Sequence, residues 1–230
     1  MAISYEALFP DVLPQVRGCP DTLVENNIRS AAIEFCEKAE AYRIELDPIT
    51  AVAKKYEYEF DVPSGTVVHR IEWMTYEGGD LEPLTSSLLE QRLPEWRDRT
   101  GKPTYYVQQS SEAFYIAPTP ASNASLAIRV KAVLKPTHTS SACDNDVMNN
   151  YRDAIVNGAL FRLLRMPNKD WTDLSAAGVY GSLFNEAIAR ASEIARGANT
   201  AVARKVKYGG IGGARSGARK TRRRDYGNNW

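Results

Sequence analysis

The chain has 230 residues, of which 43% are hydrophobic and 10% aromatic, with a formal net charge of +1. This length and composition fit a globular protein with one large core or two small ones. No run approaches the eighteen apolar residues that a membrane helix needs, and residues 1–6 do not resemble a secretion signal. Cys19, Cys36 and Cys143 are odd in number and lack CxxC spacing. The sequence therefore predicts reduced thiols and no membrane segment.

Helical periodicity dominates the first part of the chain. A short helix is expected from Ser4 to Leu13, and a longer one from Pro20 or Asp21 to Asp47. Asp47-Pro48 should end the longer helix, because the residue before proline disfavours the helical conformation. Its apolar residues recur at steps of three and four and predict one buried face: Val24, Ile28, Ala31, Phe35, Ala39, Tyr42 and Leu46.

The middle of the chain changes to strand periodicity. Strands are expected at 54–60, 67–76, 81–84, 104–109, 113–117 and 126–134, with a short helix at 87–93. The turn Glu77-Gly78-Gly79-Asp80 predicts a hairpin that pairs Val67–Tyr76 with Leu81–Leu84. Strands at such close spacing favour an antiparallel sandwich or small barrel.

The helical period returns at Asp146, which is predicted to cap a helix running to Met166. A second helix is expected from Asp170 to about Arg196. Gly178 and Gly181 should weaken this second helix or allow close packing. Its predicted buried face comprises Leu174, Ala177, Phe184, Ile188, Ala191 and Ile194.

The predicted fold class is α+β: a helical bundle interrupted by an antiparallel β-sandwich or barrel-like insertion, with an extended C-terminal arm. The domain boundaries are 1–48 for the first helices, 49–136 for the β domain, 137–196 for the helices that complete the bundle, and 197–230 for the arm. The first and last helices are expected to pack together in one core.

The arm concentrates positive charge. Residues 197–230 carry nine Lys or Arg, one acidic residue and seven of the fifteen glycines, so residues 1–196 are acidic overall. With few apolar side chains to bury, the arm is predicted to be mobile until it binds an acidic partner. A solubilising tail is the alternative, but Tyr208, Tyr226 and the terminal Trp230 favour docking, since Trp is a frequent interface anchor.

Catalytic, metal and nucleotide motifs are not recognisable. The separation of Gly212 and Gly217 suits a phosphate loop, but Ala218 stands where that motif requires lysine. His69 and His138 have no Cys, Asp or Glu at zinc-ligand spacing, and the pair His138 and Cys143 forms no known nucleophile arrangement. The helix carboxylates of Glu34, Glu37 and Glu40 are interpreted as a solvated or inter-subunit face. The sequence thus predicts no enzyme, no cofactor and no metal site.

Aromatic residues in the predicted strands allow two interpretations. Tyr105, Tyr106, Phe114 and Tyr115 could stack on nucleic-acid bases or sugars. Alternate aromatic residues in strands more often fill a sandwich core, and we favour this interpretation.

Three groups of motifs occur in order along the chain. The first is Ala41-Tyr42-Arg43 near the end of the long helix. The second comprises Gly101-Lys102-Pro103-Thr104-Tyr105-Tyr106-Val107, Phe114–Pro120 and Leu126–Ala132, and the third is Tyr151–Leu160. Over roughly residues 20–196 the chain resembles the head-to-tail adaptors of tailed phages, the group that includes the podovirus tail tubular protein A.

This resemblance implies a structural protein of the virion, located at the head-tail junction and assembled in the host cytoplasm. Such adaptors form a ring, usually a homododecamer, beneath the portal protein, and receive a downstream tail or nozzle protein. Carried onto this chain, it places the arm on the portal. The residues expected to bind there are Arg215, Arg219, Lys220, Arg222, Arg223, Arg224, Tyr226 and Trp230.

Two other functions are considered for the basic arm. It could bind nucleic acid by neutralising phosphates, and contact with packaged DNA is compatible with the adaptor role. A host regulatory or ribosome-associated protein with a basic tail would instead be a monomer or dimer that never forms rings. A protein partner requires fixed anchors such as Trp230, whereas DNA requires mostly charge.

Overall fold

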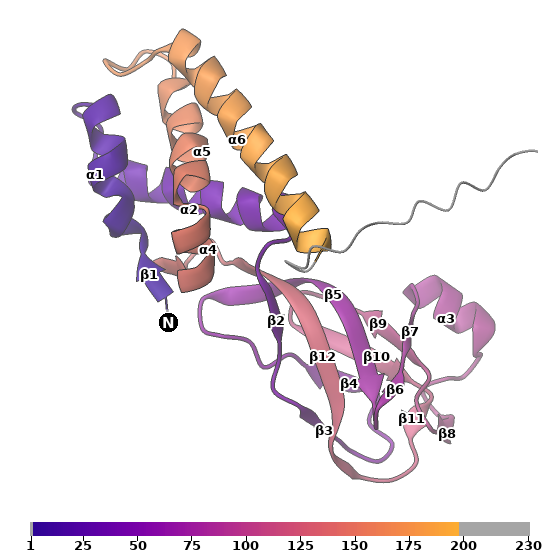
Figure 1. The fold of residues 1–230 in the computed structure, drawn as a ribbon. Coiled ribbons are helices and arrows are strands. Elements are labelled where there is room, and N and C mark those ends of the chain that lie inside the picture. Colours follow the sequence, from indigo (N-terminus) through magenta and orange to yellow (C-terminus); the bar gives the residue numbers. More distant parts are fainter. Residues whose placement is uncertain (1, 198–230) are drawn as a thin grey trace, which may run out of the picture. The chain divides into compact units, whose positions relative to one another are not determined.

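The structure, a computed structural model, describes residues 2–197 (Figure 1). Within this range, helical elements come first, strands follow, and helices return. Most of the strands pair antiparallel, with a curled sheet among them, so the α+β class predicted from the sequence is confirmed. None of the helices described is long and apolar enough to cross a membrane.

The N-terminal segment is broken into short pieces rather than forming the single helix expected from Ser4 to Leu13. Strand β1 (Ala2–Ser4) leads into the 3₁₀ turn η1 (Tyr5–Leu8), helix α1 (Phe9–Val12) and the 3₁₀ turn η2 (Leu13–Gln15). Pro10 and Pro14 lie in the first turns of α1 and η2. Proline has no N–H to donate in a helix interior, so each of these two prolines prevents the preceding turn from continuing as a regular helix.

Helix α2 (Asp21–Ala39) ends earlier than the sequence predicted. Glu40 adopts the left-handed conformation with φ 51°, and its N–H bonds the carbonyl of Cys36. Tyr42 and Leu46 are buried as expected, but they flank the extended strand β2 (Arg43–Glu45). The predicted end at Asp47 was wrong because Tyr42 and Leu46, although they lie outside the helix, are buried in the same core at a spacing that matches a helix.

Two sheets make up the middle of the chain. The first pairs β2, β12 (Ala124–Pro136), β5 (Thr66–Tyr76) and β6 (Gly79–Asp80) in that order, with β3 (Ile49–Ala51) also on β12. The second has the order β4 (Glu57–Glu59), β10 (Ala113–Ala117), β9 (Tyr105–Gln108) and β7 (Glu82–Pro83). Strands β8 (Thr100–Gly101) and β11 (Thr119–Pro120) form a separate parallel pair, and α3 (Ser86–Arg92) follows β7.

The hairpin predicted after β5 is shorter than expected. Only Gly79 and Asp80 pair with β5, and the N–H of Leu81 still bonds the carbonyl of Met74 at 3.0 Å. The chain then crosses to the other sheet, where β7 runs parallel to β9. The segment Leu81–Leu84 therefore connects the two sheets and is not simply the second arm of a hairpin.

The C-terminal helices also differ from the single helix predicted between Asp146 and Met166. Strand β13 (Ala142–Asp144) precedes α4 (Asn145–Asn150) and α5 (Arg152–Leu164), which are separated at Tyr151. Asp144, not Asp146, caps α4, because its carboxylate accepts a bond from the Asp146 N–H at 2.9 Å. Helix α6 (Leu174–Arg196) is capped by Asp173, later than the predicted start at Asp170.

One hydrophobic core joins helices that lie far apart in the sequence. Ile28 of α2, Ile155 of α5 and Ile128 of β12 belong to the same buried cluster. Helix α2 packs against α5, α6 and β12, so helices before and after the strands share one core. The three cysteines are buried as free thiols.

Candidate docking surfaces

The residues predicted to bind the portal lie outside the described part of the chain, at 215–230. The structure does describe α6, which ends at Arg196 and is followed by its C-cap residue Gly197. Within residues 2–197, exposed apolar side chains and a groove between strands are the features that bear on contact with other proteins.

Helix α6 carries several exposed apolar side chains, which lie on more than one side of the helix. Four of the seven large hydrophobic residues that are exposed within residues 2–197 belong to this helix: Leu174 (70% exposed), Val179 (59%), Leu183 (43%) and Ile194 (43%). The sequence had placed Leu174 and Ile194 on the buried face, which is wrong. The buried face is formed instead by Ala177, Gly181, Phe184, Ile188, Ala191 and Ala195.

The two glycines of α6 lie in different surroundings. A Cβ added to Gly181 would stand 2.8 Å from the ring of Phe161 in α5, so this glycine permits the close contact of two helices. A Cβ added to Gly178 would meet no atom within 4 Å. Glycine inside a helix costs about 1 kcal/mol relative to alanine. Internal packing thus explains Gly181 but not Gly178.

A second apolar surface lies on the N-terminal segment. Pro10 and Pro14 are exposed, while Phe9 and Leu13 are partly buried against the core. Helix α5 packs against both α1 and α6, which lie on opposite sides of it (Figure 1). Exposed apolar residues therefore occur on the N-terminal segment as well as on α6.

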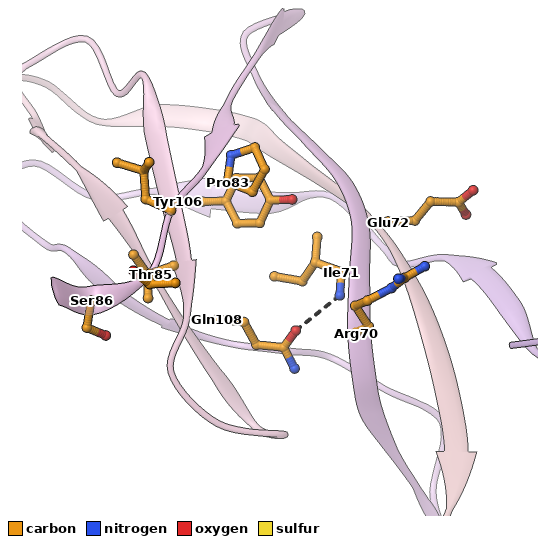
Figure 2. A pocket seen from close by; sticks show the side chains of 10 residues that line it. Arg70, Ile71, Glu72, Pro83, Thr85, Ser86, Tyr106 and Gln108 are labelled. Carbon is orange, nitrogen blue, oxygen red and sulfur yellow. Dashed lines mark hydrogen bonds between the residues drawn. The ribbon is translucent and has the colours of Figure 1, made fainter. Parts of the chain in front are cut away.

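A groove of about 660 Å³ separates β5 from β7 and β9 (Figure 2). The side chain of Gln108 crosses it: Oε1 accepts a bond from the Ile71 N–H at 3.1 Å, and Nε2 donates to the carbonyl of His69 at 3.3 Å. The Gln108 amide therefore hydrogen-bonds the Ile71 N–H and the His69 carbonyl, two backbone groups of β5 to which an added strand would otherwise bond. On the other side, Pro83 offers no N–H. Both strand edges are thus blunted, and the groove is poorly suited to receive an added strand.

The strand aromatics fill cores, in agreement with the favoured interpretation. Tyr106 and Phe114 are 6% and 0% exposed. Tyr105 and Tyr115 are partly buried beside Trp96, whose ring centroid is 5.7 Å from that of Tyr115. Base stacking on these rings would require opening a packed cluster.

The carboxylates of α2 and of its C-cap residue Glu40 form ion pairs within the chain, which the sequence did not predict. Glu34 pairs with Arg162 of α5, and Glu37 pairs with Lys135 of β12 at 2.5 Å. Glu40 pairs with Arg70 of β5 at 2.7 Å. Burial opposes ionisation of Glu34, but hydrogen bonds from Lys38 and Arg162 and their charges hold its pKa below the ordinary value. These groups connect α2 to its neighbours rather than forming an acid-base site.

The candidate nucleophile Cys143 is enclosed in the protein. Cys143 is 2% exposed and belongs to the main core. Among the residues searched, which exclude residue 1 and 198–230, no group of three or more His, Cys, Asp or Glu is arranged to hold a metal ion.

Comparison with known proteins agrees with the resemblance found in the motifs. A search of curated proteins gave no match. The model of the family described as SU10 adaptor protein matches residues 11–205, which is most of the chain and extends beyond α6. This is a family of phage head-to-tail adaptors, that is, structural proteins of the virion. The chain therefore belongs to the SU10 adaptor protein family.

Proposed function

We propose that this adaptor forms a closed ring beneath the portal at the head-tail junction and receives the next tail protein. The match to an adaptor family over residues 11–205 is the observation that carries the proposal. In a closed ring, each subunit contacts two neighbouring copies, one on each side. Exposed apolar residues on α6 and on the N-terminal segment are available for such contacts. The role is structural, with assembly in the host cytoplasm and no catalytic step.

The C-terminal arm would then attach the ring to the portal. Its nine Lys or Arg suit acidic portal surface, and Trp230 supplies an apolar anchor. A tethered arm has a high effective concentration at its binding site, so it strengthens docking without a larger rigid interface. A ring of twelve copies, the number usual among the adaptors that this chain resembles, would multiply this gain.

Electron microscopy of the purified full chain, alone and mixed with the portal of the same virus, tests this function. We expect rings that sit coaxially on the portal. A chain ending at Gly197 should dock more weakly than the full chain. Monomers or dimers that never associate with portal rings would contradict the adaptor role.

Binding of nucleic acid by the arm remains the alternative, since its basic residues would neutralise phosphates. This alternative predicts duplex binding by the full chain that is lost in the chain ending at Gly197, with portal docking unchanged. Measuring both activities on the same two proteins separates the two functions.

A further inference from the structure

We propose that residues 85–98 form a strap that opens as one unit while the main core stays closed. The strap consists of α3 and the turns that follow it, between β7 and β8. In its closed position it completes a small aromatic core on the second sheet, which is separate from the main core. This inference concerns the β part of the chain and does not depend on the proposed ring.

The strap buries little apolar surface. Within residues 82–102, the apolar side chains that are buried in the small core are those of Leu89 and Trp96, at 1% and 2% exposed. Leu84 and Leu93 are partly buried against the same core. Segments with few buried apolar contacts open at a lower free energy than the core of the same protein. Two buried side chains therefore do most of the work of holding the strap between its ends.

The backbone of the strap is attached to the sheet at its two ends. At the first end, the N–H of Leu84 bonds the carbonyl of Tyr106 at 2.9 Å. At the second end, both the N–H and the hydroxyl of Thr119 bond the carbonyl of Arg99, each at 2.9 Å. Between these ends, and within residues 2–197, the backbone hydrogen bonds of the strap join strap residues to one another. The strap can therefore leave the sheet without breaking a backbone ladder.

The ion pairs of the strap join residues that are close in sequence. Glu90 pairs with Arg97 at 2.7 Å, and Arg92 pairs with Glu82 of β7 at 2.7 Å. The side chains of both pairs are about half exposed, so water screens them and they contribute little to holding the strap on the sheet. The Arg92 guanidinium also lies 6.0 Å from the ring centre of Tyr105, an exposed contact of the same modest kind.

Two features of the closed strap are unfavourable. Glu95 has φ 58°, a left-handed conformation that costs free energy for a residue with a Cβ atom. The indole N–H of Trp96 is buried beside the Glu90 carboxylate but makes no hydrogen bond of normal geometry within residues 2–197. In an open strap, water satisfies this N–H. Both features lower the free energy needed to open the strap.

Opening uncovers an aromatic surface that lies outside the strap. The ring centres of Tyr56 and Tyr115 lie 5.3 Å and 5.7 Å from that of Trp96, and 5.5 Å from each other. Val107 of β9 and Ala117 of β10 belong to the same small core and are 2% and 0% exposed. Figure 1 shows α3 at the edge of the strands, beside β7. The strap is thus a cover whose position decides whether this surface meets water.

Native-state hydrogen exchange of the full chain in low urea tests the opening. The amides of Leu89 and Leu93 report on the strap, and the Leu134 amide, which bonds the Tyr42 carbonyl at 2.8 Å, reports on the main core. We expect the two strap amides to share one protection factor, at least tenfold below that of Leu134, and a weaker dependence on urea. Equal protection and urea dependence at all three amides would overturn the proposal. Different values at Leu89 and Leu93 would show fraying of α3 and contradict opening as a unit.

Two adjacent leucines provide a matched pair of substitutions. Leu88 and Leu89 both belong to α3, but they are 43% and 1% exposed. Leu89→Ala should raise exchange at the Leu93 amide at least tenfold and leave the Leu134 amide unchanged, whereas Leu88→Ala should change neither. Equal effects of the two substitutions at Leu93 would contradict closure by Leu89. An equal rise at Leu134 would show that the strap unfolds only with the main core.

Thiol labelling detects the uncovered surface directly. Val107 lies under the strap and Val130 lies in the main core, and they are 2% and 1% exposed. The native cysteines are at most 7% exposed, so the unchanged protein gives the background rate. The thiol of Val107→Cys should react with a water-soluble maleimide at least tenfold faster than that of Val130→Cys, and faster still when combined with Leu89→Ala. Equal rates for the two single variants would show that the strap does not open by itself.

Discussion

A Cβ atom built on Gly158 of α5 would stand 2.8 Å from Cε2 of Phe184 in α6. On its other side, the same atom would lie 3.0 Å from the Cβ of Ala31 in α2. Gly158 is therefore a position at which three long helices, α2, α5 and α6, approach one another closely. Phe184 is 2% exposed and fully enclosed, so it has little room to move away.

The three helix glycines should respond differently to alanine. Gly158→Ala should lower the free energy of unfolding by about 1–3 kcal/mol, because the added methyl overpacks the core. Gly181→Ala should cost less, since the half-buried ring of Phe161 can shift. Gly178→Ala should stabilise the single copy by up to about 1 kcal/mol through helix propensity. Urea denaturation of non-assembled protein measures all three, and a stabilising Gly158→Ala would contradict the tight packing.

The sequence could predict these helices but not where they stop or which way they face. Tyr42 and Leu46 fit the apolar spacing of α2, yet they enter the core from an extended segment after Glu40 turns left-handed. No glycine or proline marks that turn. Similarly, Leu174 was assigned to the apolar face of α6, but it is the first residue of that helix and is 70% exposed.

The exposure of apolar residues on α6 could not be predicted from the sequence for a related reason. Helical periodicity places an apolar residue on a face of the helix. It does not say whether that residue is buried by other parts of the same chain. The open space beside Gly178 becomes visible only when α5 and α6 are placed together. The adaptor family was recognisable because its motifs are local in sequence.

Stability should depend on pH through Glu34. The pKa of this carboxyl is lower in the folded chain than its usual value. Its ionised form therefore stabilises the fold above the unfolded pKa, and this contribution is lost as pH falls through the folded pKa. Glu34→Gln should cost about 1 kcal/mol near pH 7 and progressively less below pH of about 4. The exposed Glu186→Gln is the control, and an equal cost of Glu34→Gln at pH 7 and pH 3 would contradict the ion pair.

The Gln108 amide should hold β5 in register. Gln108→Leu keeps the approximate volume but removes the bonds to Ile71 N–H and the His69 carbonyl. We expect a loss of about 1–2 kcal/mol in the free energy of unfolding and faster hydrogen exchange at the Ile71 amide. Gln109→Leu, at an exposed neighbouring position, provides the matched control. Unchanged exchange at Ile71 would argue against this role.

The described part of the chain should fold without the arm. The main hydrophobic cluster includes no buried residue beyond Ala191 among those described. A chain ending at Gly197 is expected to retain the helix content and melting temperature of the full chain, measured by circular dichroism. A melting temperature lower by more than a few degrees would show that residues 198–230 contribute to the core.

Charge and apolar anchoring by the arm should be separable on the portal. Replacing Arg222, Arg223 and Arg224 by alanine should weaken portal binding and flatten its dependence on salt, because salt screens exposed ion pairs. Trp230→Ala should weaken binding without changing the salt dependence, since burial of the indole ring is driven by the hydrophobic effect. Affinities measured between low and high salt distinguish the two contributions. If arginine replacement abolishes duplex DNA binding while portal affinity stays the same at every salt concentration, the arm binds nucleic acid and does not clamp the portal.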